Sequence, residues 1–86
     1  MNEQTQQLVD LLHEYVELKA DIYDCTMTIW GGPEHLMQDF LISRDEAQTI
    51  INGYGKRLRE VLQPKQKEMI AMFSEEYGLD IEKLSP

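Results

Sequence analysis

The sequence contains little that could cross-link the chain or hold it in a membrane. Cys25 is the one cysteine among 86 residues, so no disulfide can form within the chain. No apolar run approaches about 18 residues, the length that a membrane-spanning helix needs. The N-terminus has neither the basic nor the apolar region of a secretory signal. We therefore expect a cytoplasmic protein that makes no membrane contact and is held together by packing alone.

Positive charge is also scarce, and it is unevenly placed. Eight Lys and Arg stand against sixteen Asp and Glu, which gives a net charge of −8. Residues 1–43 contain eight acidic residues and a single base, Lys19, whereas six of the bases fall within residues 44–67. Affinity for a nucleic-acid backbone comes from clustered Lys and Arg, so this balance disfavours nucleic-acid binding. An acidic surface instead suits a basic protein partner.

No segment alternates apolar and polar residues with the period of two that a β-strand shows. Apolar residues instead recur at spacings of three and four along the first third of the chain. This buried-seam series comprises Leu8, Leu11, Tyr15, Leu18, Ile22, Cys25 and Ile29. The spacing predicts one long α-helix, about residues 3–30, that packs along its length against other helices. A free cysteine on such a seam acts as a small hydrophobe.

The predicted first helix carries two further stripes. One repeats every seven residues and widens the apolar face: Val9, Val16, Tyr23 and Trp30. The other, termed the acidic ridge, lies within about 80° on the opposite side and comprises Asp10, Glu14, Glu17, Asp21 and Asp24. The apolar residues cover about half of the helix circumference, too much for a few short helices to bury. We therefore expect Tyr23 and Trp30 to lie at a protein interface, most economically in a homodimer.

Shorter helices are expected after the first. The run from Gly31 to Pro33 ends the first helix, and Pro33 can open a short helix that reaches about Leu41. Its apolar residues are expected to face inward: Leu36, Met37, Phe40 and Leu41. Ser43 and Glu46 have the spacing of a capping box, in which each side chain accepts a hydrogen bond from the backbone of the other residue. A third helix therefore begins there.

The third helix keeps its apolar rhythm across Gly53 and Gly55, so we predict one continuous helix through them. Pro64 is expected to break or kink the chain after Gln63, because proline cannot continue the hydrogen-bond ladder. A fourth helix then ends at Gly78, and a last short turn follows Asp80. The whole sequence, residues 1–86, is predicted to be a single all-α domain. It is a small helical bundle built on one long N-terminal helix followed by three or four shorter ones.

The acidic ridge is the main candidate for a binding surface. Its carboxylates are spaced about one helical turn apart and could engage a row of Lys or Arg on a partner. Like charges at this spacing repel each other, so the ridge does not stabilise the helix by itself. Two alternatives remain open: the ridge is a solvated outer face, or it pairs internally with Arg57 and Arg59.

The same residues also suggest a metal-dependent enzyme. Glu14-x-x-Glu17 followed by Asp21-x-x-Asp24 resembles the carboxylate motifs of the all-α nucleoside-triphosphate pyrophosphohydrolases, and that resemblance implies Mg²⁺-dependent phosphohydrolysis. In that family the acids come from two facing helices, whereas here all four lie on one helix. Mg²⁺ needs converging oxygen ligands, so we expect no metal and no cofactor. His13 and His35, on different helices and without a supporting cysteine, do not form a zinc site.

A helix-turn-helix regulator is another alternative. It rests on the turn near Ser43 and on a basic cluster farther along the chain, made of Lys56, Arg57, Arg59, Lys65 and Lys67. A recognition helix reads bases with its N-terminal part, but that part of the third helix carries Asp45 and Glu46. Pairing of the basic cluster with the acidic first helix is the favoured interpretation.

With these alternatives weighed, the sequence favours a non-enzymatic protein-interaction module. We expect a small acidic regulator or inhibitor that binds another macromolecule through helical surface. One such target is the cationic site of a nucleic-acid-handling protein.

Overall fold

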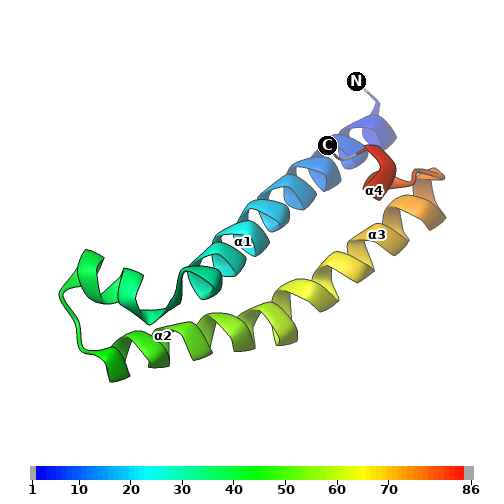
Figure 1. The fold of residues 1–86 in the computed structure, drawn as a ribbon. Helices are drawn as coiled ribbons and strands as arrows, with labels where there is room; N and C mark the ends of the chain where they lie inside the picture. Colours follow the sequence, from blue (N-terminus) through cyan, green and yellow to red (C-terminus); the bar gives the residue numbers. More distant parts are fainter. Residues whose placement is uncertain (1, 85–86) are drawn as a thin grey trace.

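The chain folds into a long helical hairpin (Figure 1), seen in a computed structural model that describes residues 2–84, with the backbone alone for Leu84. The hairpin measures 52 × 22 × 21 Å and has a radius of gyration of 16.7 Å, against about 12 Å for a compact domain of this length. No strand occurs within residues 2–84, so the predicted all-α class is confirmed. The elements in chain order are α1 (Glu3–Phe40), α2 (Arg44–Arg57), the π-helix η1 (Leu58–Leu62), α3 (Gln63–Tyr77) and α4 (Ile81–Leu84).

The first arm of the hairpin is α1, which runs helically from Glu3 and bends near its far end. Gly32 alone departs from helical geometry, with φ 78° and ψ 175°, a conformation open to glycine and strained for other residues. Pro33 follows it and lacks the N–H that would continue the ladder. The predicted uninterrupted helix over 3–30 is therefore confirmed. After the bend the helix resumes and reaches Phe40.

A hydrogen-bonded turn connects α1 to α2. The Ser43 hydroxyl oxygen accepts from the backbone N–H of Glu46 at 3.1 Å, and Glu46 Oε1 accepts from the N–H of Ser43 at 3.2 Å. The predicted capping box is thus confirmed. The Ser43 backbone N–H and, to a smaller extent, the Ser43 hydroxyl stabilise the ionised carboxylate, so the pKa of Glu46 lies below its usual value. Arg44 Nη1 also lies 2.7 Å from Glu34 Oε1 and joins the two arms at this end.

The second arm is one continuous rod formed by α2, η1 and α3 (Figure 1). Here the expected break at Pro64 is wrong, because the chain stays helical through it. In an α-helix the proline ring would clash with the carbonyl of Glu60, four residues earlier. The wider π-turn directly before it avoids this clash, and the Gln63 N–H donates to the Leu58 carbonyl, five residues back. The helix also continues through Gly53 and Gly55, as predicted.

Two clusters of buried side chains hold the arms together. Most of the buried seam of α1 meets η1, α3 and α4 in the larger cluster, whose buried members are Leu11, Tyr15, Leu18, Cys25, Leu62, Met69, Phe73 and Ile81. Within it the rings of Tyr15 and Phe73 meet edge to face at 5.6 Å. The smaller cluster lies near the turn of the hairpin and contains Leu36, Ala47 and Ile51. Cys25 is 4% exposed and packs as the small hydrophobe that the sequence predicts.

The second arm ends as the sequence predicts. Gly78 adopts the left-handed conformation, with φ 63°, and its N–H donates to the carbonyls of Phe73 and Ser74. The N–H of Leu79 also donates to the Phe73 carbonyl, at 3.0 Å. This turn directs α4 back toward the start of α1 (Figure 1), where Ile81 enters the larger core cluster.

Candidate interaction surfaces

The acidic ridge lies on the outside of α1. The contacts with the second arm use the buried seam, about 110° around the helix from the centre of the ridge, and every carboxylate of the ridge is exposed, as the sequence predicts: Asp10, Glu14, Glu17, Asp21 and Asp24. At the N-terminal end, Asp10 Oδ1 accepts a hydrogen bond from Gln6 Nε2 at 2.9 Å. The ridge thus presents a line of carboxylates to solvent along most of the straight part of α1.

The internal pairing considered for the ridge is not formed between described residues. Arg57 shares a groove of about 200 Å³ with three ridge carboxylates, but no ion pair within 4.0 Å joins them. The residues lining this groove are Glu14, Glu17, Leu18, Asp21, Arg57, Val61, Leu62 and Lys65. Arg57 and Arg59 are two positions apart, about 200° around a helix, so they cannot both face α1. The expected pairing of the basic cluster with the first helix is therefore wrong for these two arginines.

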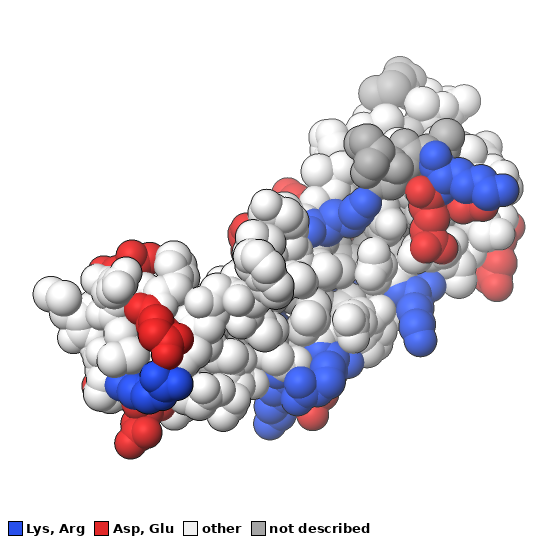
Figure 2. Space-filling model, viewed as in Figure 1, with Lys and Arg blue, Asp and Glu red and all other residues white. Residues whose placement is uncertain are grey.

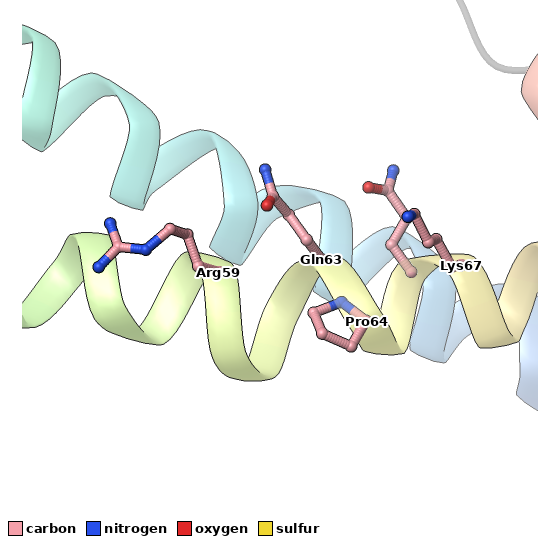
Figure 3. A pocket seen from close by; sticks show the side chains of 5 residues that line it. Arg59, Gln63, Pro64 and Lys67 are labelled. Carbon is pink, nitrogen blue, oxygen red and sulfur yellow. The ribbon is translucent and has the colours of Figure 1, made fainter.

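Arg59 lies on the other flank of the second arm. It lines a shallow groove of about 500 Å³ together with Gln63, Pro64, Gln66 and Lys67. In Figure 3 the side chains of Arg59, Gln63 and Lys67 extend from the same side of the rod. Figure 2 shows Lys and Arg side chains along this arm, with large uncharged areas between them. The basic cluster is thus divided between two faces instead of forming one patch.

The apolar stripe of α1 that repeats every seven residues is left largely uncovered by the second arm. Val16 and Tyr23 are each 64% exposed, and Trp30 is 82% exposed, whereas Val9 is half-buried. Ala20 and Met27 are also exposed and fall between these residues in the sequence. The five positions 16, 20, 23, 27 and 30 repeat at spacings of four and three, and we term them the outer seam. The sequence prediction did not include Ala20 in this surface, although its spacing was a usable signal.

A second uncovered apolar surface lies where α1 approaches α2 after the bend. We term it the distal groove; it has a volume of about 370 Å³ and is lined by Thr28, His35, Leu36, Asp39, Phe40, Ile50 and Tyr54. Phe40 is 66% exposed and Leu41 is 91% exposed, so the expectation that both face inward is wrong. Phe40 is the last residue of α1 and Leu41, its C-cap, has the left-handed φ of 54°, so Leu36 and Met37 alone of the four inward candidates pack on the smaller core cluster.

The distal groove adjoins the end of the acidic ridge. A neighbouring hollow shares Thr28 and His35 with the groove and is also lined by Asp24, the last ridge residue, and by Met27 and Trp30. On the rim, His35 Nε2 lies 3.3 Å from Asp39 Oδ2. The charged groups that line these two hollows are carboxylates and one histidine, with no Lys or Arg. The surface therefore combines apolar contact area with negative charge at its edge.

Within residues 2–84, no group of three or more His, Cys, Asp or Glu side chains is placed to hold a metal ion. The four candidate metal ligands all remain on α1. Glu14, Glu17 and Asp21 line the groove that contains Arg57 and Lys65, and Asp24 lines the hollow beside Trp30. At the start of α2, where a recognition helix would read bases, Arg44 is engaged by Glu34. The backbone N–H of Glu34, followed by the hydrogen bond and charge of Arg44, holds the pKa of the Glu34 carboxyl below its usual value.

The chain matches no protein-family model, no curated protein and no solved structure. None of the helices described over residues 2–84 has both the length and the apolar character that crossing a bilayer requires.

Proposed function

We propose that this chain is a non-enzymatic protein-interaction module that acts as a small acidic regulator or inhibitor. It binds a cationic segment of another macromolecule along the acidic ridge and the adjoining distal groove. The cationic site of a nucleic-acid-handling protein is a target of this chemistry. The proposal includes the cytoplasmic location and the homodimer expected from the sequence.

The observation that carries the proposal is the continuity of the ridge with an apolar groove. A solvated outer face needs charge but has no need of exposed aromatic side chains. Here Asp24 ends the ridge beside Trp30, and the distal groove beyond it exposes Phe40, Ile50 and Tyr54. Exposed aromatic residues beside charges of one sign are typical of protein-binding surfaces, in which the aromatics supply affinity and the charges orient the partner.

The chemistry of the surface restricts the partner. A helical segment with a row of Lys or Arg can follow the ridge, because both rows repeat once per helical turn. An apolar side chain at one end of that segment would enter the distal groove. Because the ridge charges are exposed, the electrostatic part of the affinity weakens with added salt.

The first test removes charge from the ridge and follows partner capture. The triple variant Glu14→Ser, Glu17→Ser and Asp21→Ser is compared with a control that loses three exposed carboxylates of α3 instead: Glu68→Ser, Glu75→Ser and Glu76→Ser. Both variants change the net charge equally. We expect the ridge variant to lose capture of a partner from lysate of the source cells, while the control retains it. Equal capture by both variants would contradict a binding role for the ridge.

The second test uses a defined probe and addresses the groove. A synthetic helical peptide with Lys at every fourth position and one terminal Leu is titrated calorimetrically into the protein. We expect Phe40→Ser and the ridge variant each to weaken binding at least tenfold, because they remove different parts of the same surface. Unchanged affinity in Phe40→Ser would restrict the site to the ridge.

A further inference from the structure

We propose that the outer seam of α1 pairs with the outer seam of a second copy in a parallel, in-register two-stranded coiled coil. The inference rests on the homodimer included in the proposed function and specifies which surface forms it and in which orientation. It is carried by three features of α1: the spacing of the exposed apolar residues, their area, and the charges on the two flanks of the seam.

The spacing is that of a coiled-coil seam. The exposed residues Val16, Ala20, Tyr23, Met27 and Trp30 alternate steps of four and three, the repeat at which two helices interlock side chains along their length. The buried seam of α1 lies about 140° around the helix from this outer seam. Among the described residues, the second arm therefore leaves Val16, Tyr23, Met27 and Trp30 exposed to a second copy.

The exposed area is appropriate for the centre of a stable interface. With aromatic side chains of about 150–250 Å², Tyr23 at 64% and Trp30 at 82% exposure leave on the order of 300 Å² uncovered per copy. Val16 and Met27, 64% and 43% exposed, extend this area along the helix. A standard interface buries about 800 Å² per partner, with an apolar centre and a polar rim. The seam supplies the centre, and the residues beside it supply the rim.

The charges beside the seam favour the parallel orientation. One flank is acidic, since Asp10, Glu17 and Asp24 directly follow Val9, Val16 and Tyr23 in the sequence. The corresponding positions on the other flank are Leu12, Lys19 and Thr26, which include no carboxylate. In a parallel pair each flank faces the unlike flank of the other copy, whereas in an antiparallel pair the acidic flanks face each other.

In the parallel register Lys19 of one copy comes opposite Asp24 of the other, five residues farther on, and the symmetry makes this pair twice. Within its own chain the Lys19 ammonium lies 5.9 Å from the centroid of the Tyr15 ring. The Asp24 carboxylate is exposed on the ridge.

The test is a cysteine substitution in the seam, combined with sedimentation. The full chain carrying Ala20→Cys is incubated with oxidised glutathione, and its matched control carries Ala71→Cys at an exposed position of α3. Cys25 is buried and serves as the common background. We expect a covalent dimer of twice the 10.1 kDa chain mass in the first variant and none in the control. In a parallel in-register pair the two introduced thiols meet across the seam, because they share one level.

A charge variant distinguishes the parallel from the antiparallel orientation without a cross-linking reaction. Asp24→Lys places like charges together in the parallel pair and removes a repulsion in the antiparallel pair. We expect a dimer that is roughly three- to tenfold weaker, with affinity restored in the double variant Lys19→Glu and Asp24→Lys. Stronger dimerisation of Asp24→Lys, or a dimer without the Ala20→Cys cross-link, would overturn the parallel register.

Sedimentation of the unmodified chain at about 100 µM tests the dimer itself. A chain that stays monomeric at this concentration would overturn the proposal. Glu17 borders the seam, so the capture experiment is repeated with Glu14→Ser and Asp21→Ser alone, whose residues lie outside the seam and its flanks. Failure of the coiled coil and failure of the binding function are therefore separate outcomes.

Discussion

Phe73 shows how few side chains hold this hairpin together. It has no exposed surface, and its ring meets Tyr15 across the larger core cluster. The chain has one other phenylalanine, Phe40, which is 66% exposed in the distal groove. The two residues have the same chemistry and opposite environments, so they form a matched pair for separating core packing from surface contact.

We predict that Phe73→Ala destabilises the fold by about 3–5 kcal/mol, because it removes a buried ring and leaves a cavity. Phe40→Ala should change stability by no more than about 0.5 kcal/mol. Urea denaturation followed by circular dichroism measures both. Similar losses in the two variants would show that Phe40 is buried in solution.

The capping box at Ser43 supports a prediction about pH. The Ser43 N–H stabilises ionised Glu46 in the folded state and lowers its pKa. A group with a lowered folded pKa contributes stability above its unfolded pKa and loses it as the pH falls through the folded value. We therefore expect Ser43→Gly, which keeps the backbone N–H but removes the hydroxyl, to raise the Glu46 pKa only part of the way to its usual value. Titration followed by NMR of the Glu46 side-chain carboxyl carbon measures this shift.

At the scale of elements, the second arm crosses a proline without interruption. The buried positions of α2 and α3 face α1 on both sides of Pro64, so the helix has to keep its phase through it. The π-helix η1 directly precedes Pro64, and the Gln63 N–H donates to the Leu58 carbonyl five residues back, so the rod stays helical at this point. A helix that broke at Pro64 would shift the smaller core cluster, which contains Ile51, relative to the larger one, which contains Phe73.

Two glycines of the second arm should respond oppositely to the same substitution. A Cβ at Gly53 would meet no atom within 4 Å, and the residue is helical, so Gly53→Ala should stabilise the fold by about 0.5–1 kcal/mol. Gly78 has φ 63° and ends α3, so Gly78→Ala should destabilise it by about 1 kcal/mol. Thermal unfolding compares the two variants with the parent chain. A destabilised Gly53→Ala would mean that another molecule contacts α2 at this point.

At the scale of the molecule, the elongated shape leaves most of the negative charge exposed to solvent. A long hairpin has much surface for 86 residues, and this surface carries a net charge of −8. The ridge carboxylates lie on one line with no ion pair to a described base, so their mutual repulsion opposes folding. The unfolded chain reduces this repulsion by expanding.

We therefore expect salt to stabilise the protein. Raising sodium chloride from about 10 mM to about 150 mM shortens the screening length from about 30 Å to about 8 Å, and the unfolding midpoint should rise. The ridge variant Glu14→Ser, Glu17→Ser and Asp21→Ser should show a smaller rise than the α3 control variant. Differential scanning calorimetry at both salt concentrations measures the effect, and a midpoint that falls with salt would show that favourable ion pairs dominate.

Local patterns in the sequence were sufficient to predict the helices and their caps. The buried seam from Leu8 to Ile29, the bend at Gly32, the capping box at Ser43 and the end of α3 at Gly78 all depend on neighbouring residues. Such features follow from helical periodicity and backbone chemistry, which act over a few positions. The same periodicity placed the acidic ridge on the outside of α1 before any contact was known.

What depended on the tertiary structure was the partner of each apolar face. In the outer seam, Val16, Tyr23 and Trp30 are as apolar as the residues of the buried seam. They are exposed because the second arm covers the other side of α1. The inward assignment of Phe40 was wrong because α1 ends there, at the open distal groove, where no distant segment covers its ring. An apolar face is covered by a segment that is distant in the sequence, and the residues of the face do not determine whether such a segment packs on it.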